Sequence, residues 1–204
     1  MRCTGSACPV KKSLEAAERD EQQREDFREE VAAIARRRLV FADETGFNLA
    51  MTRRFGRAPR GLRVRQAVPR KRGTNVTLVG ALALRGWVAA LSFSGSLDRE
   101  AFDAFVTGLL VPRLRRADVV LLDNLRVHHA SDVEEAVRSA RARVLWLPSY
   151  SPDFSPLESC WSKVKAIVRG EEPRSPRGLD AALTQALNAV TAADVDGWFR
   201  HCGY

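Results

Sequence analysis

The chain has 204 residues, 45% of them hydrophobic and 28% charged, and its 33 Lys and Arg against 25 Asp and Glu give a net charge of +8. This length and composition fit one soluble globular domain with short appendages, and the basic balance favours a polyanionic partner such as nucleic acid. No apolar stretch is long enough to cross a bilayer and the N-terminal residues lack the apolar core of a secretion signal, which excludes a membrane or secreted protein and predicts a cytoplasmic one.

The N-terminal part of the chain carries a helical pattern. Residues 14–38 are rich in Glu, Arg, Gln and Ala, and Phe27, Val31 and Ile34 fall on one helical stripe. The pattern predicts a long, mostly exposed helix. We interpret residues 1–38 as a linker helix region whose upstream partner is missing, and residues 39–204 as the folded domain.

Three β-rich runs follow this helix. The run RRLVFADETGF predicts a central strand that ends at Asp43, with the Thr-Gly pair after it forming a turn. Residues 75–84 and 87–93 are two further runs, separated by Arg85 and Gly86 in a position suited to a tight hairpin turn. Because no helix intervenes, these runs predict an antiparallel meander.

The segment between the first two strands carries more positive charge than the net charge of the whole chain. Between Met51 and Thr74 no acidic residue accompanies the nine basic ones, Arg53, Arg54, Arg57, Arg60, Arg63, Arg65, Arg70, Lys71 and Arg72. Such a tract predicts contacts with DNA phosphates. The alternative is a solvated loop in a protein from an arginine-rich proteome, because only five of the basic residues in the chain are lysine.

The second half of the chain alternates strands and helices. Apolar spacing predicts a helix over residues 98–114, then ADVVLLDN predicts a buried strand, residues 132–142 a helix and RVLWLP another strand. Three further helices follow, over residues 156–168, around 179–190 and around 195–199. This order predicts a ribonuclease-H-like α/β fold, a mixed five-stranded sheet in which three antiparallel strands precede the parallel ones, flanked by helices.

The cysteines show neither a paired C-x-x-C spacing nor the density of a disulfide scaffold. We therefore interpret Cys3, Cys8, Cys160 and Cys202 as reduced, structurally incidental thiols. A zinc site built from Cys202, His201 and the His128/His129 pair is the less favoured alternative, because the spacings match no familiar zinc pattern.

Three acids form the candidate site. Asp43 and Asp123 each follow an apolar strand, where an acid is costly to bury without a partner, and Glu158 lies in the first turn of a helix. Taken singly, each has a structural explanation. The aspartates are residues that cap turns, and Ser155-Pro156-Leu157-Glu158 forms a good capping box in which Glu158 would reach back to the amide of Ser155. Taken together, they match the need of two-metal phosphodiester cleavage for several carboxylate ligands around two cations.

The blocks FADETGFNL, LLDNLRVHH and LPSYSPDFSPLESCWSKVK resemble the three catalytic blocks of DDE transposases of the mariner-like superfamily, in its bacterial insertion-sequence branch. The 34 residues between Asp123 and Glu158 match that superfamily's spacing. The resemblance implies two Mg²⁺ or Mn²⁺ ions, with Asp43 bridging both, Asp123 binding one and Glu158 completing the other. It also makes Asn124 and His128 accessory site residues, with a merely structural role as the alternative.

By the same resemblance, the protein would cleave DNA at transposon ends and join it to target DNA at TA dinucleotides, as a homodimer associated with the nucleoid. Two departures stand out. Ser155 replaces the usual Asn before the third acid, and the helix-turn-helix modules of the family are absent, so a separate or full-length chain would have to supply them. The rivals are a truncated, non-catalytic remnant that binds DNA or a full-length transposase as an inhibitor, and a nuclease of the same fold such as a junction resolvase.

Overall fold

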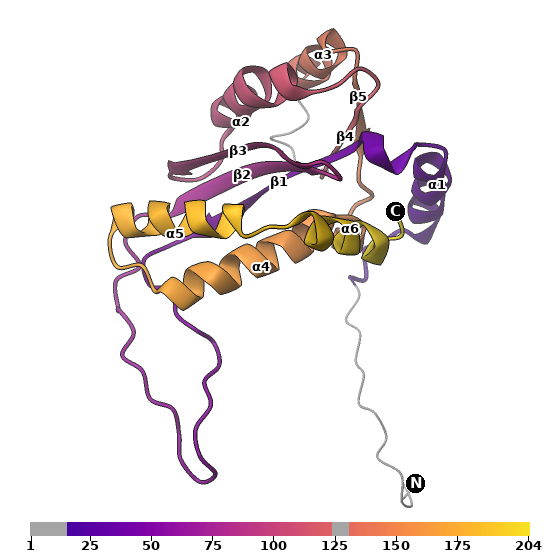
Figure 1. Ribbon diagram of the computed structural model, residues 1–204. Helices are drawn as coiled ribbons and strands as arrows, with labels where there is room; N and C mark the ends of the chain where they lie inside the picture. The colour runs from indigo at the N-terminus through magenta and orange to yellow at the C-terminus, as the bar shows by residue number, and fades with distance from the viewer. Residues whose placement is uncertain (1–15, 124–130) are drawn as a thin grey trace, which may run out of the picture.

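The computed structural model describes residues 16–123 and 131–204, and these build a mixed five-stranded sheet with helices on both faces (Figure 1). The strands lie in the order β3-β2-β1-β4-β5. Their bounds are β1 Leu39–Phe47, β2 Val76–Ala83, β3 Gly86–Ser94, β4 Val119–Leu122 and β5 Arg143–Trp146. Because β1, β2 and β3 pair antiparallel while β1, β4 and β5 pair parallel, the predicted mixed sheet is confirmed.

The helices form two layers around this sheet (Figure 1). One face is covered by α4 (Pro156–Glu171), α5 (Pro176–Asn188) and α6 (Ala192–His201), and the other by α2 (Arg99–Phe105) and α3 (Ser131–Ser139). The helical path of α2 continues through the turns η2 (Val106–Leu110) and η3 (Val111–Arg113), so the helix predicted over residues 98–114 is confirmed. Among the described residues, no helix is both long and apolar enough to cross a membrane.

The side chains of β1 alternate between two apolar clusters, which fixes the direction of the first acid. Leu39 and Phe41 join the cluster that contains the buried residues of α4, α5 and α6, whereas Val40 and Ala42 join the cluster that contains those of α2 and α3. Since side chains two apart on a strand share a face, Asp43 points to the same side as Phe41, towards α4.

Two predicted boundaries in the meander are wrong. Asp43 does not close its strand, because β1 continues to Phe47 and pairs with β2 along that whole length, so Thr45 and Gly46 are strand residues rather than a turn. The tight turn between β2 and β3 is confirmed but lies one residue earlier, at Leu84 and Arg85. Gly86 opens β3 with a φ of 97°, a conformation that glycine adopts without a steric penalty.

Helix α1 (Glu21–Ala32) is shorter than the predicted helix over residues 14–38. It begins where the side chain of Asp20 accepts hydrogen bonds from the amides of Gln22 and Gln23, and after it the chain forms the separate 3-10 turn η1 (Arg36–Arg38). The predicted apolar stripe is confirmed, because Phe27 and Val31 are buried in the cluster beneath α4. The role of residues 1–38 as a linker to another module stays a prediction.

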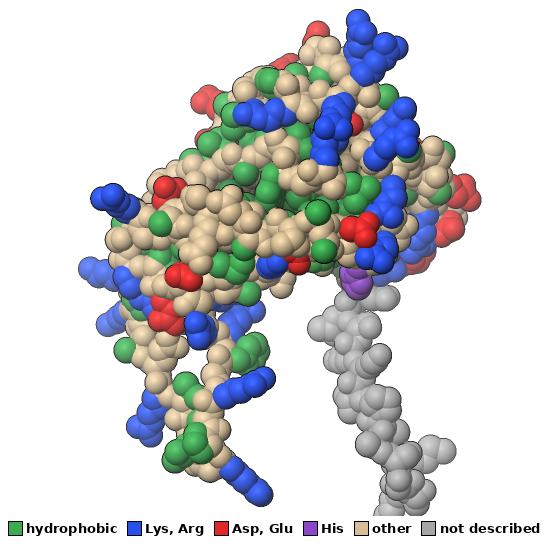
Figure 2. Space-filling view, viewed as in Figure 1, with side chains coloured by type: hydrophobic (Ala, Val, Ile, Leu, Met, Phe, Trp, Pro, Cys, Tyr) green, Lys and Arg blue, Asp and Glu red, His purple; other side chains and the backbone are tan. Residues whose placement is uncertain are grey.

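Residues 48–75, between β1 and β2, leave the sheet as a long projecting segment without helix or strand (Figure 1). The amide of Leu49 donates to the carbonyl of Arg72 at 2.9 Å, which joins the two arms near their base. Further out, the side chains are exposed, including Phe55 at 90% and Leu62 at 68%. Figure 2 shows Lys and Arg side chains extending from both arms. The basic tract of the sequence therefore lies on this projection.

Candidate active site

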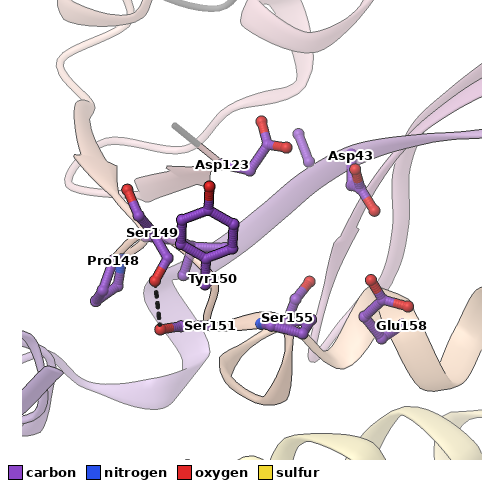
Figure 3. Close-up of a pocket in the computed structure, with 11 residues that line it drawn as sticks. Asp43, Asp123, Pro148, Ser149, Tyr150, Ser151, Ser155 and Glu158 are labelled. Atoms are coloured by element: carbon purple, nitrogen blue, oxygen red, sulfur yellow. Dashed lines mark hydrogen bonds between the residues drawn. The ribbon is translucent and has the colours of Figure 1, made fainter. Parts of the chain in front are cut away.

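The three predicted acids line one cavity of about 400 Å³ (Figure 3). In the parallel register of β1 and β4, Phe41 lies opposite Leu121, so Asp43 and Asp123, each two residues further on, emerge side by side. Glu158 comes from the first turn of α4, beneath the sheet. The rest of the cavity wall is Ala42, Leu147, Pro148, Ser149, Tyr150, Ser151, Pro152 and Ser155. The predicted convergence of the two strand segments with the helix is confirmed.

Figure 3 shows the carboxylates of Asp43 and Glu158 turned towards one another, with Asp123 entering from the end of the neighbouring strand. Within the described residues, no three Asp, Glu, His or Cys side chains stand close enough to hold a metal ion as they are arranged. The acids therefore share a cavity without forming a closed ligand cage.

The pKa of Asp43 is raised well above the usual range of an aspartate. Burial raises its pKa to about 7, the neighbouring charges of Glu44 and Asp123 add to the rise, and a hydrogen bond from Trp161 opposes it. Its carboxylate is thus only partly ionised near neutral pH. Because like charges and desolvation both disfavour the anion, a cation in the cavity would favour it strongly.

Trp161 orients Asp43, a role that the sequence did not predict. Its indole Nε1 donates to Asp43 Oδ2 at 2.9 Å, and its ring stacks on Trp87 with 5.7 Å between centroids. Gly80 lies opposite Asp43 across the β1–β2 ladder, and a Cβ there would lie 2.7 Å from Trp161 and 2.8 Å from Trp87. Only glycine lets the two indoles lie against the strand. A glycine inside an apolar strand was the one available signal, because such positions mark close approaches.

Glu158 is not engaged in the predicted capping box. Ser155 is the N-cap of α4 and Pro156 takes its first position, as predicted, but neither arm of a side-chain cap is formed in this fully described helix start. Glu158 is instead exposed at the cavity. Its carboxylate is therefore available to a ligand in the cavity rather than occupied with the helix terminus.

The wall of the cavity between β5 and α4 is tied to α1. Arg24, only 1% exposed, donates from Nη1 to Asp153 Oδ1 at 3.0 Å and from Nη2 to Oδ2 at 2.6 Å. Asp153 belongs to the turn η4 (Pro152–Phe154), and the hydrogen bonds from Arg24 lower its pKa. The same guanidinium lies 4.1 Å from the ring centroid of Phe154, whose carbonyl accepts from Tyr204 Oη at 2.7 Å. The N-terminal helix and the C-terminal residue thus hold this wall in place.

Among the described residues, the other predicted site residues do not line the cavity. Asn124 and His128 fall outside the described residues, as does the His128/His129 pair of the zinc alternative. Cys160 is buried, and burial raises its pKa to about 12, as expected of an inert thiol. The basic residues from Arg53 to Arg72 are exposed on the projection and do not line the acidic cavity. Their contact with DNA stays a prediction.

A family model described as DDE superfamily endonuclease matches residues 38–179, which include all three acids. The chain belongs to the DDE superfamily endonucleases. The match covers well over half of the chain, and the resemblance to DDE transposases seen in the sequence is confirmed.

Known transposases are among the proteins most similar to this DDE endonuclease domain. The Tcb2 transposase of Caenorhabditis briggsae is 28% identical over 167 residues, which are 77% of this chain and 61% of that protein. The Mos1 strand transfer complex superposes with a TM-score of 0.73 at 18% identity, covering 98% of this chain and 63% of the Mos1 chain. A Mos1 paired-end complex with Mn gives a TM-score of 0.73 at 16% identity, covering 100% and 65%. The fold is therefore that of a ribonuclease-H-like transposase catalytic domain, and the chain spans about three-fifths of its curated relative.

Proposed function

We propose that this chain is the catalytic domain of a transposase that cleaves DNA strands at transposon ends and joins the freed ends to target DNA. The observation that carries the proposal is the meeting of Asp43, Asp123 and Glu158, from three separate elements, in one cavity. A set of carboxylates in a cavity suits phosphodiester cleavage assisted by divalent cations. The likeness to the Mos1 transposase, which forms a paired-end complex with a left transposon end, supports the choice of substrate.

The residues of the cavity fit Mg²⁺ or Mn²⁺. All three acids offer oxygen ligands, which these hard cations prefer, and the raised pKa of Asp43 marks a carboxylate that is short of a positive partner. Two bound cations would lower the pKa of the attacking water and stabilise the leaving oxygen. The tasks of the chain itself are to present the three carboxylates, to orient Asp43 through Trp161 and to hold the cavity wall through Arg24.

The partners follow from the same proposal. The basic residues on the projection, Arg53 to Arg72, would hold the phosphate backbone that the acidic cavity repels. Recognition of transposon ends would come from helix-turn-helix modules in a separate or full-length chain, and the active form would be a homodimer acting on DNA in the cytoplasm. The two-ion arrangement and the roles of Asn124 and His128 belong to this proposal as well.

Nicking of supercoiled plasmid at low salt with Mg²⁺ or Mn²⁺ tests the activity. The unmutated chain should nick, EDTA should stop it, and Asp43→Ala, Asp123→Ala and Glu158→Ala should each be inactive. Asp180→Ala, which removes an exposed acid of α5 outside the cavity, is the matched control and should nick normally. If the unmutated chain binds DNA yet is as inert as the three variants, also after a DNA-binding module is supplied, the proposal fails and a non-catalytic remnant takes its place.

A further inference from the structure

A second basic surface lies at the opposite end of the parallel strands from the acids. Leu39, Val119 and Arg143 lie side by side in the register of β1, β4 and β5, so the residues that precede these strands meet at one end of the sheet. Six arginines gather there, which we call the arginine face: Arg37, Arg38, Arg115, Arg116, Arg141 and Arg143. Figure 2 shows Lys and Arg side chains clustered at the end of the molecule where Figure 1 places β5 and the turn before β1.

The arginine face carries more positive charge than the nearby acids neutralise. All six side chains are exposed. Arg143 pairs with Glu30 at 2.7 Å, and the structure gives the other five no ion pair with any described residue. The nearby Asp118 is buried and already occupied, because its Oδ2 accepts from Arg85 at 2.7 Å and from the amide of Arg115 at 2.8 Å.

The backbone beneath these side chains is held rigidly. The amide of Ala117 donates to the carbonyl of Arg141 at 2.8 Å, and the amide of Arg143 donates to the carbonyl of Asp118 at 3.1 Å. Ala117 and Arg141 both have left-handed backbones, with φ of 64° and 57°. Side chains other than glycine adopt this conformation at a cost, and such positions gather at sites with a function. Between the two loops and residues 33–35 lies a hollow of about 340 Å³, bordered by Arg38, Arg141 and Arg143.

This face is separate from the basic projection. Residues 48–75 leave β1 after Phe47, beyond Asp43, whereas the arginine face precedes Leu39 at the other end of the same strand. A strand rises about 3.3 Å per residue, so the start of β4 lies roughly 13 Å along the strand from Asp123. The arginine face and the acids therefore lie at opposite ends of the parallel strands.

We propose that the arginine face binds the phosphate backbone of duplex DNA as a second DNA-binding surface, distinct from the acidic cavity and from the projection. Guanidinium groups bind phosphate oxygens in pairs of parallel hydrogen bonds, and a duplex offers one charge per about 1.7 Å of its axis. A protein partner fits less well, because protein interfaces have an apolar centre. The large exposed hydrophobic residues of the described chain, Phe55, Leu62, Val64, Val68 and Tyr150, all lie elsewhere.

The salt dependence of binding to a short duplex of arbitrary sequence tests this proposal. Binding is measured in EDTA, which prevents cleavage. The result is therefore independent of whether the proposed catalytic function is correct. Arg115→Gln, Arg116→Gln and Arg141→Gln, combined, should lower the slope of log affinity against log salt by about 2 to 3, since each phosphate contact contributes about 0.9. Affinity at moderate salt should fall on the order of 10- to 100-fold.

Two matched triple variants separate a specific surface from general loss of charge or of fold. Arg99→Gln, Arg177→Gln and Arg200→Gln remove the same charge from exposed positions elsewhere and should change affinity by less than about threefold. Replacing Arg115, Arg116 and Arg141 by Lys keeps the charge and should preserve the slope. If the face variant and the charge control show equal slopes and affinities, or if the Lys variant behaves as the Gln variant does, the proposal is overturned.

Discussion

The two ends of the three parallel strands carry opposite charge and are built by opposite means. At the C-terminal end, Asp43 and Asp123 lie half-buried beside one another, and the fold raises the pKa of Asp43 instead of pairing it with a cation. At the N-terminal end, arginines are exposed on loops that backbone hydrogen bonds hold in place. The acidic end therefore costs stability through the burial of a carboxylate, whereas the arginine side chains of the basic end stay solvated and the cost there is confined to the left-handed backbones of Ala117 and Arg141.

The strongest test of this contrast is Asp43→Asn. We expect it to lower plasmid nicking by more than about 100-fold, because the variant loses a carboxylate of the cavity. The free energy of unfolding, in contrast, should increase in this variant. The pKa of Asp43 is higher in the folded chain than in the unfolded chain, so between about pH 4 and pH 7 the folded chain holds a proton that the unfolded chain has lost. The native protein is therefore destabilised increasingly as the pH rises through this window.

In EDTA, Asp43→Asn should therefore be more stable than the unmutated chain by an amount that grows over this pH window, on the order of 3 kcal/mol above pH 8. Denaturant unfolding at a series of pH values measures it. Asp180→Asn is the control and should show no such growth, because Asp180 is exposed. A constant difference between Asp43→Asn and the unmutated chain at all pH values would contradict the account of the acidic end.

Gly80→Ala tests how closely the acidic end is packed. The added methyl group would meet Trp161 and Trp87 at distances that force both indoles to move. We expect a loss of about 1 to 3 kcal/mol in the free energy of unfolding, together with reduced nicking, because Asp43 loses its oriented donor. Gly46→Ala in β1 is the matched control, since nothing lies within 4 Å of a Cβ there and its φ is not positive. Equal effects of the two substitutions would argue against the packing requirement.

Trp161→Phe isolates the hydrogen bond from the packing. It keeps an aromatic ring against Trp87 but removes the donor that lowers the pKa of Asp43, so that pKa should rise. At limiting Mg²⁺, where the proton competes with the cation for Asp43, nicking at pH 7 should fall several-fold and recover as the pH increases. Trp87→Phe removes an indole that donates to the carbonyl of Leu187 instead, and its pH–rate profile should stay where it is. An unshifted pH–rate profile for Trp161→Phe would show that the hydrogen bond from Trp161 does not act on Asp43.

The smallest effect is expected from the arginine face. With saturating protein at low salt, the Arg115, Arg116 and Arg141 to Gln variant should nick within about twofold of the unmutated rate, because the face lies roughly a strand length from the acids. At higher salt its nicking should fall further behind as phosphate contacts are lost. Loss of nicking at low salt, with the fold intact by circular dichroism, would show that the two ends do not work separately.

Local patterns predicted the strands of the acidic end well, because the alternation of side chains along a strand depends on residues close together in the sequence. The convergence of Asp43, Asp123 and Glu158 followed from these patterns and from the family resemblance. The end of β1 was predicted too early, since pairing with β2 continues through two residues that otherwise favour a turn. The supporting contacts of the site were not predictable, because they join distant residues that no motif marks. Arg24 and Asp153 are 129 positions apart, and Trp161 and Asp43 are 118 apart.

The tie between Arg24 and Asp153 has a consequence for how such a domain is inherited. The wall of the cavity depends on a helix that precedes the first strand, so the smallest unit that inherits an intact cavity includes α1 as well as the sheet. Recombination that joins other sequence upstream keeps both the helix cap and Arg24 only when the junction falls before Asp20, the residue that caps this helix. A junction after Arg24, still inside α1, would preserve every acid of the cavity and yet leave descendants without the buried guanidinium that holds its wall.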